Sequence, residues 1–369
     1  MPTTTGSEKP KVTFFDGLKV KNLVSFMVKE YDHSGELFTI QKTATVEAAL
    51  KELKNRNVLS LPVCDDEGNI EGVISTLDIV VAVVFAPIYT RYDEQATSKL
   101  TLNDLKSVTT NKALFKSQVG NLCGINEESR KVEVFWDDDD LSEVANKLSR
   151  GFHRVLVKVR EEPKKMYLVS QTDFLRYIHS QIQSQPGFAK CMSQPLGRLN
   201  LIEKKRIITV DETERVVLGF RKLWQGGPVF DWSLSALPVV DSKGELKGTL
   251  SGSDIRGMTA DKLNDLMLSV RHFLRKHQPG GMRVPEQVTL EMPFSKALKQ
   301  IIDAGVHRLW VTGKDKDKNK VTGVLSLTDI LYKFATFDLN QHHAKSASEA
   351  GGQDERKILS DDDAIFDAL

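Results

Sequence analysis

One pattern of residues occurs four times along this chain of 369 residues, and it limits the possible folds more than any other feature. Each copy has an amphipathic helix pattern, a β-branched strand, a polar turn, a second apolar strand and a Ser-x-x-Asp motif that opens another apolar run. Self-similarity of this kind is typical of a repeat architecture. The four motifs are Ser75-Thr76-Leu77-Asp78, Ser170-Gln171-Thr172-Asp173, Ser251-Gly252-Ser253-Asp254 and Ser326-Leu327-Thr328-Asp329.

The segments before each motif keep a common order and spacing. Three helix patterns place apolar residues at i, i+3, i+4 and i+7, which predicts one buried helix face. These stripes are Val46-Ala49-Leu50-Leu53, Leu141-Val144-Ala145-Leu148 and Phe294-Ala297-Leu298-Ile301. The third copy is less regular, with Val216, Phe220 and Leu223 on one face and an insertion from Gln225 to Asp231.

The strand that follows each helix lies at a nearly constant distance from its motif. The first strands are Leu61–Val63, Val155–Val157, Leu237–Val240 and Leu309–Val311. The motif Asp lies 16, 17, 16 and 19 residues after the second residue of its strand. The polar segments between the two strands read as hairpin connections. Four near-equal spacings indicate one structural unit repeated in register.

Composition sets the outer limits on the class of protein. A content of 40% hydrophobic, 27% charged and 7% aromatic residues is typical of a globular chain. With 51 basic and 50 acidic residues, the chain lacks the positive field that attracts nucleic acid, so we expect no nucleic-acid partner. The longest apolar run, from Ile79 to Tyr89, is shorter than the roughly 20 residues needed to span a bilayer. We therefore expect a buried helix there and no membrane span.

The three cysteines, Cys64, Cys123 and Cys191, lie far apart and lack the spacing of a zinc site. We expect no metal site and a reducing compartment. The polar N-terminal sequence MPTTTGSEKP has no apolar core for secretion. The predicted location is the cytoplasm, with the nucleus as a further location.

These repeats resemble the CBS-domain superfamily, whose repeats pair into Bateman modules, and within it the gamma regulatory subunit of AMP-activated and SNF1-type protein kinases. The resemblance covers about residues 15 to 338 and is strongest in the third and fourth copies. It implies an α/β fold in which two Bateman modules, residues 15–182 and 193–338, pack as a disk around a nucleotide channel. The predicted segments are a flexible N-terminus at 1–14, CBS repeats at 15–92, 108–182, 193–260 and 264–338, and a flexible acidic tail at 342–369.

The resemblance also implies a role for the motifs. In the family, the motif Asp accepts hydrogen bonds from the ribose hydroxyls of a nucleotide, while the Ser and the helix N-terminus lie near phosphate. The implied nucleotide-binding residues are Ser75, Asp78, Ser170, Asp173, Ser235, Ala236, Ser251, Asp254, Ser326 and Asp329. The alternative is a capping box that satisfies backbone N–H groups at a helix start. A capping box prefers Glu or Gln at this place, whereas all four copies have Asp, and the two roles can coexist.

A His-Arg dipeptide precedes the strand in the second and fourth copies only, as His153-Arg154 and His307-Arg308. One such His is usually a core residue whose hydrogen bonds are satisfied within the protein. Its recurrence in alternate copies instead favours a phosphate site, where imidazole and guanidinium donors converge.

The sequence departs from the gamma-subunit pattern in two places. Leu59 stands where the family usually has an Arg, with Arg56 as the nearest substitute, so one phosphate contact of the family does not carry over. Thr172-Asp173 replaces a Lys-Arg pair of animal gamma subunits, so the second site could be usable here. A helix between the third and fourth copies could supply the missing charge through Arg271, Arg275, Lys276 or His277.

Motifs of catalysis are missing from the sequence: it has no P-loop, no GxGxxG after a strand, no HExxH and no nucleophile motif. We therefore expect a non-enzyme without a covalent cofactor. The resemblance implies that AMP, ADP and ATP act as regulatory ligands and that the partners are a kinase catalytic (alpha) subunit and a scaffold (beta) subunit. Two alternatives stay open: a stand-alone CBS regulator of another enzyme or transporter, and a structural core with decayed sites.

Overall fold

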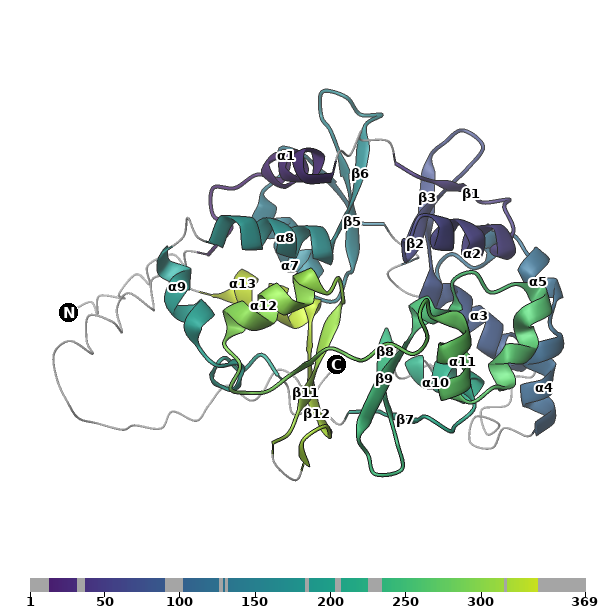
Figure 1. Ribbon diagram of the computed structural model, residues 1–369. Coiled ribbons are helices and arrows are strands. Elements are labelled where there is room, and N and C mark those ends of the chain that lie inside the picture. The colour runs from purple at the N-terminus through teal and green to yellow at the C-terminus, as the bar shows by residue number, and fades with distance from the viewer. Residues whose placement is uncertain are drawn as a thin grey trace, which may run out of the picture.

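The computed structural model describes residues 13–31, 37–89, 102–125, 129, 132–182, 186–202, 207–224, 234–314 and 317–337. It contains four α/β units, each with a three-stranded sheet. In each sheet the first strand runs parallel to the second, and the second runs antiparallel to the third. This confirms the predicted fold class (Figure 1).

The elements of the four units follow the same order along the chain. Unit 1 contains β1 (Ile40–Gln41), α2 (Val46–Asn55), β2 (Ser60–Cys64), β3 (Ile70–Ser75) and α3 (Thr76–Tyr89). Unit 2 contains β4 (Val134–Trp136), α7 (Leu141–Ser149), β5 (Arg154–Lys158), β6 (Met166–Ser170) and α8 (Gln171–Gln181). Unit 3 contains β7 (Val210–Asp211), α10 (Val216–Leu223), β8 (Ala236–Val240), β9 (Leu246–Ser251) and the short 3₁₀ helix η5 (Gly252–Ile255). Unit 4 contains β10 (Gln287–Val288), α12 (Phe294–Asp303), β11 (Arg308–Thr312), β12 (Val321–Ser326) and α13 (Leu327–Thr336).

The predicted apolar stripes are the buried faces of α2, α7, α10 and α12, where every stripe residue is at most 1% exposed. Each Val, Leu, Ile or Phe among them contributes roughly 1.5–3 kcal/mol when it is buried fully. Helix α2 begins where Thr45 Oγ1 accepts the Ala48 N–H at 3.1 Å, and this side-chain cap ends the preceding turn. The predicted buried helix is α3, whose residues Ile79 to Val84 are at most 6% exposed. In the described part of the chain, no helix is long and apolar enough to cross a membrane.

The third unit differs from the others after its motif. Its Ser-x-x-Asp motif opens only η5, whereas α3, α8 and α13 follow the other motifs. Gly252 starts this segment, and Gly257 has a positive φ of 74°, a backbone conformation that ends helices. The expected apolar helix is therefore replaced here by a single tight turn.

Units 1 and 2 exchange the segments that precede them. Helix α1 (Val20–Tyr31), which comes before unit 1, packs on unit 2, and its Val20 N–H donates to Asp139 O at 3.0 Å. The segment with α4 (Leu102–Thr110), α5 (Ala113–Lys116) and η2 (Val119–Asn121) comes before unit 2 but packs on unit 1, where Val119 N–H donates to Ala44 O at 2.8 Å. The exchange ties the two units into one pair.

Units 3 and 4 form a second pair in the same way. The segment with α9 (Pro186–Ser193) and η4 (Leu196–Arg198) packs on unit 4, where Leu196 N–H donates to Met292 O at 3.0 Å. The segment with η6 (Ala260–Met267) and α11 (Val270–His277) packs on unit 3, where Val270 N–H donates to Glu214 O at 2.8 Å. The two pairs correspond to the two predicted modules, while the exact repeat boundaries stay a prediction.

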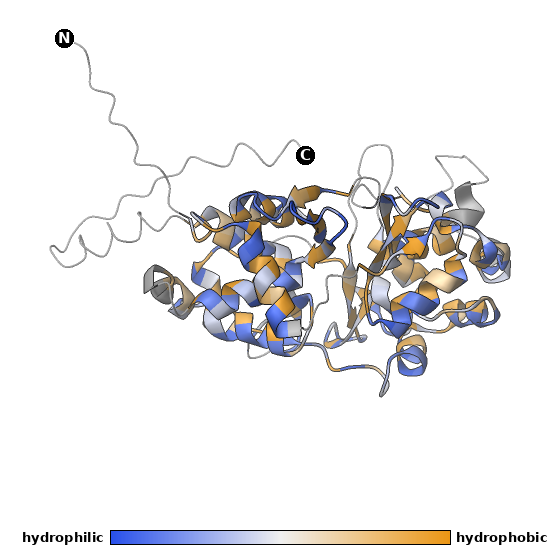
Figure 2. Cartoon of the chain, turned by 90° about the horizontal axis from the view of Figure 1, so that it is seen from above, coloured by the Kyte–Doolittle hydropathy of each residue, from blue (hydrophilic) through white to orange (hydrophobic). Residues whose placement is uncertain are grey.

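The hydrophobic cores connect the pairs to each other. One core joins residues of units 2 and 4, and the other joins residues of units 1 and 3. Each unit thus touches one neighbour through exchanged helices and another through a shared core, so the four units close into a ring. Helices occupy the two outer sides and the sheets lie between them (Figures 1 and 2).

The N-terminal boundary differs from the prediction. Phe14 falls in the segment predicted to be flexible, yet it is 1% exposed and packs edge-to-face on Phe15, Phe188 and Phe334. The predicted acidic tail and the insertion from Gln225 to Asp231 lie outside the described residues.

Candidate functional site

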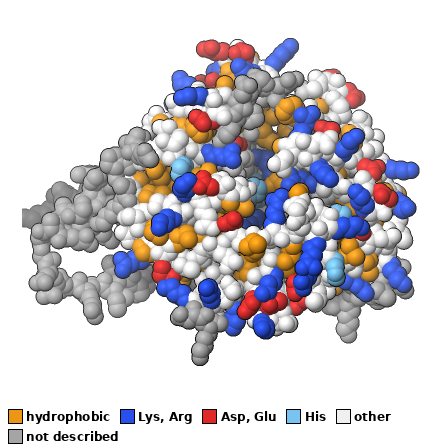
Figure 3. Space-filling view, in the orientation of Figure 1, with side chains coloured by type: hydrophobic (Ala, Val, Ile, Leu, Met, Phe, Trp, Pro, Cys, Tyr) orange, Lys and Arg blue, Asp and Glu red, His pale blue; other side chains and the backbone are white. Residues whose placement is uncertain are grey.

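A cavity of about 1190 Å³ lies where the four units meet. Figure 3 shows a hollow in this face of the molecule, with basic side chains inside it. Eleven of the fourteen residues predicted from the sequence line this cavity. They are Ser75, His153, Arg154, Ser170, Asp173, Ser235, Ala236, His307, Arg308, Ser326 and Asp329.

The hairpin register explains why the His-Arg pairs meet the motifs. Arg154, the first residue of β5, pairs with Ser170, the last residue of β6. Arg308 of β11 pairs with Ser326 of β12 in the same way. Each dipeptide therefore lies beside the start of the helix that follows its own motif, with the Leu327 N–H donating to His307 O at 3.1 Å in unit 4.

The corresponding positions of units 1 and 3 carry no cation. Ser60 pairs with Ser75 in unit 1, and Ala236 pairs with Ser251 in unit 3. The residue before each is Leu59 and Ser235 respectively, in place of the two histidines. The two basic units, 2 and 4, thus share one hydrophobic core, and the two neutral units, 1 and 3, share the other.

The charged groups of unit 2 act on His307 of unit 4 across the cavity. Burial, followed by the charges of Arg308, His153, Arg154 and Arg256, lowers the pKa of His307 to about 3. The imidazole lines the cavity, yet it is neutral at physiological pH because its pKa lies far below 7.

Arg308 is held in place by a neighbouring unit. Burial lowers its pKa to about 10, although the Asp329 carboxylate opposes this change, so the guanidinium keeps its charge. Arg308 Nη2 donates to Ser235 Oγ of unit 3 at 2.7 Å. This bond fixes a cation at the junction of units 3 and 4.

The starts of α8 and α13 also lie at the cavity. Both helices have capping boxes: Ser170 N–H donates to Asp173 Oδ2 at 2.9 Å, and Ser326 N–H donates to Asp329 Oδ2 at 2.7 Å. Gln171 Nε2 donates to Thr328 Oγ1 at 2.9 Å and joins the two helix starts. Two partly positive helix ends and two His-Arg pairs therefore converge, which suits an anion.

Three predicted site residues are not brought to this cavity. Asp78 is fully buried, and its Oδ1 accepts a hydrogen bond from Ser129 Oγ at 2.7 Å. Ser251 and Asp254 form a capping box in unit 3, outside the cavity lining. The capping interpretation accounts for these three residues, because their polar atoms are engaged within the protein.

The helix suggested as a source of extra charge does not reach the cavity. Arg271, Lys276 and His277 of α11 pair with Glu212 or Asp265 instead. At the position where the sequence departs from the gamma pattern, Leu59 and its nearest cationic substitute Arg56 both line the cavity. The Arg56 guanidinium stacks 3.9 Å from the Phe38 ring centroid.

Sequence reasoning missed two further arginines of the lining, Arg150 and Arg176. Arg176 lies one helical turn after Asp173 on α8, so the same face of the helix that carries the motif could have identified it. Arg150 lies at the end of α7, three residues before His153.

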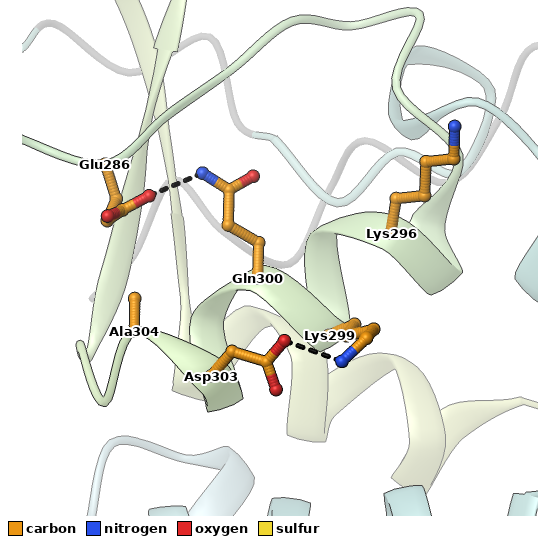
Figure 4. A pocket seen from close by; sticks show the side chains of 6 residues that line it. All are labelled: Glu286, Lys296, Lys299, Gln300, Asp303 and Ala304. Atoms are coloured by element: carbon orange, nitrogen blue, oxygen red, sulfur yellow. Dashed lines mark hydrogen bonds and ion pairs between the residues drawn. The ribbon is translucent and has the colours of Figure 1, made fainter.

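A second pocket, of about 470 Å³, lies on the outside of unit 4. Its polar groups bind one another: Gln300 Nε2 donates to Glu286 Oε2 at 2.6 Å, and Lys299 pairs with Asp303 at 2.6 Å (Figure 4). We assign it no function because four of its five polar lining side chains bond to one another.

The family model of the CBS domain matches residues 28–84, 125–180 and 282–336. These segments contain most of units 1, 2 and 4. Unit 3 is not among the matched segments although its sheet has the same topology. Its short η5 in place of a helix is one physical difference from the other three units.

Two groups of curated proteins are similar to the chain. Protein SDS23 of Kluyveromyces lactis is 21% identical over 324 residues, which are 80% of this chain and 60% of that protein. The 5′-AMP-activated protein kinase subunit gamma of Saccharomyces cerevisiae is 24% identical over 340 residues, which are 89% of this chain and 97% of that protein. The chain therefore spans about 60% of the length of the SDS23 protein but nearly all of the kinase subunit.

A solved structure from Methanocaldococcus jannaschii, described as that of an archaeal homologue of gamma-AMPK, has a TM-score of 0.58 and 18% sequence identity. The match covers 81% of this chain and 96% of that chain, so the similarity of fold extends over all four units. Three segments matched by one family model, a fourth unit with the same sheet, and relatives that include a kinase gamma subunit lead to one conclusion: the chain belongs to the CBS-domain superfamily.

Proposed function

We propose that this protein is a non-catalytic regulatory subunit that binds AMP, ADP or ATP in its central cavity and transmits the bound state to a protein kinase. The observation that carries the proposal is the convergence of His153-Arg154 and His307-Arg308 at two helix N-termini in one cavity.

The charges of the cavity support an anionic ligand. Cations that are close together and partly desolvated repel one another, and a phosphate placed between them relieves this cost. Guanidinium groups hold phosphate oxygens with two parallel hydrogen bonds, which adds geometric selectivity.

The remaining lining supports a nucleoside attached to that phosphate. The carboxylates of Asp173 and Asp329 can accept hydrogen bonds from the vicinal hydroxyls of a ribose, and both line the cavity. Ile207, Ile208 and Leu234 supply apolar surface for a base. A phosphate, a sugar and an aromatic ring thus each have a chemically matched part of the wall.

The kinase partnership rests on the relatives. The gamma subunit of the yeast kinase aligns over 97% of its length, which supports assembly with a protein kinase. We propose a catalytic (alpha) subunit and a scaffold (beta) subunit as the partners, and the cytoplasm and nucleus as the location. Regulation requires that the ligand binds two states of the complex with different affinity, because equal affinity shifts no equilibrium.

The SDS23 relatives favour a second candidate, a CBS regulator that acts on a different enzyme. Two measurements test the proposals together. Thermal unfolding should show a rise in Tm with AMP, and purification of the tagged protein from its own cells should recover a kinase catalytic subunit. A Tm rise without a kinase favours the second candidate, and no Tm rise with any adenine nucleotide indicates a structural core.

A further inference from the structure

We propose that the central cavity binds two nucleotides, one at the motif of unit 2 and one at the motif of unit 4, and that the motifs of units 1 and 3 bind none. This inference rests on the proposed function and specifies its sites. All four motifs have the same Ser and Asp, so the difference lies in the residues around them.

The unit 1 carboxylate is fully engaged inside the protein. Asp78 is 0% exposed; its Oδ2 accepts the Ser75 N–H at 2.8 Å, and its Oδ1 accepts the Ser129 hydroxyl at 2.7 Å. Ser129 is itself only 3% exposed. A ribose hydroxyl would have to displace this buried bond and would leave the Ser129 hydroxyl without its acceptor, which is costly.

The unit 3 carboxylate is closed by a different residue. Asp254 Oδ2 accepts the Ser251 N–H at 2.7 Å, and Oδ1 accepts Gln278 Nε2 at 2.9 Å. The Gln278 amide is held in this orientation because its Oε1 accepts the Arg283 N–H at 3.0 Å. Gln278, at the end of α11, therefore occupies Oδ1, the carboxylate oxygen that would otherwise accept a ribose hydroxyl.

Units 2 and 4 keep their carboxylates at the cavity. Asp173 and Asp329 both line it, each beside the His-Arg pair of its own unit. Among the described residues, Ser170 donates both of its hydrogen bonds to Asp173 Oδ2, and no residue donates to Oδ1. Only these two units combine an accessible acid with two phosphate donors.

The size of the cavity agrees with two ligands. A pocket for a single small molecule usually has a volume of about 300–1,000 Å³. The central cavity, at about 1190 Å³, is larger than this range. Because the two basic pairs face the same space, the two phosphates would lie near its middle and the two sugars towards units 2 and 4.

Titration calorimetry of the full chain with AMP tests the number of sites. We expect two AMP per chain in the wild type, one after Asp173→Ala and one after Asp329→Ala, with less than a threefold change in the affinity of the remaining site. The matched controls Asp254→Asn and Asp78→Asn should keep two, because neither acid lines the cavity. Circular dichroism and the melting temperature establish that each variant is folded.

The outcomes separate this inference from the proposed function. Three or four AMP per chain, a single AMP in the wild type, or the loss of one AMP in Asp254→Asn would overturn the two-site assignment while nucleotide binding stands. A wild type that binds no AMP, ADP or ATP would overturn the proposed function itself.

Discussion

At the residue scale, the four units are distinguished by two positions: the residue before the second strand and the first residue of that strand. His-Arg occupies them in units 2 and 4, and this could be predicted from the sequence because the dipeptides recur at matching distances from the motifs. The hydrogen bonds that occupy the acids of units 1 and 3 could not be predicted. Their donors, Ser129 and Gln278, lie 51 and 24 residues from these acids and belong to no periodic pattern.

The two arginines give the most direct test of phosphate binding. Arg154→Gln with Arg308→Gln removes two charges and roughly keeps the length of the side chains. Each hydrogen bond to a charged group contributes about 1.5–3 kcal/mol. We expect the double variant to lose at least tenfold in AMP affinity and little in adenosine affinity, as measured by calorimetry. Equal losses for the two ligands would assign the arginines to the base pocket or the fold.

His307 predicts a dependence of stability on pH. Its pKa in the folded protein is about 3, below the value near 6.5 of an unfolded chain, so acidification protonates the unfolded state first. The stability from the neutral imidazole is therefore lost as the pH falls from about 6.5 towards 3. The Tm of His307→Gln should fall less between pH 7 and pH 5 than that of the wild type, with His272→Gln as an exposed control. Parallel curves would contradict this role.

At the element scale, the helices could be predicted well because the apolar periodicity of a helix follows directly from which of its faces is buried. All of the stripes lie on buried faces, whereas the helix expected after the third motif is absent because Gly252 and Gly257 flank a single turn. The shape of a helix face depends on local residue types, which a sequence shows. The partner of that face depends on distant segments, which a sequence does not show.

Gly219 in α10 illustrates how closely one element packs on its sheet. A Cβ at this position would lie 2.6 Å from Leu250 Cδ2 and 3.2 Å from Val210 Cγ2. Alanine favours a helix over glycine by about 1 kcal/mol, but overpacking a core costs about 1–3 kcal/mol. We expect Gly219→Ala to lower the free energy of unfolding by up to about 2 kcal/mol in urea titrations. The exposed control Ser295→Ala on α12 should not lower it, and a gain for Gly219→Ala would show that Leu250 moves freely.

At the scale of the whole molecule, the chain is a closed ring in which neither pair of units is complete alone. Exchanged helices join units 1 with 2 and 3 with 4, while the two apolar cores join units 1 with 3 and 2 with 4. Repeat counting predicted four units and two modules. It could not predict which cores are shared, because every repeat offers a similar apolar face.

The shared cores predict the behaviour of half the chain. A fragment of residues 13–182 keeps the helix exchange of units 1 and 2 but exposes the faces of α3, α7 and α8 that pack on units 3 and 4. Large exposed apolar faces drive association, and a second copy of the fragment offers faces of the same kind. Light scattering coupled to gel filtration should show that the fragment self-associates. When it is mixed with a fragment of residues 186–337, we expect a complex that contains one copy of each fragment. A fragment that stays monomeric, with a cooperative unfolding transition like that of the full chain, would mean that each pair has a sufficient core of its own.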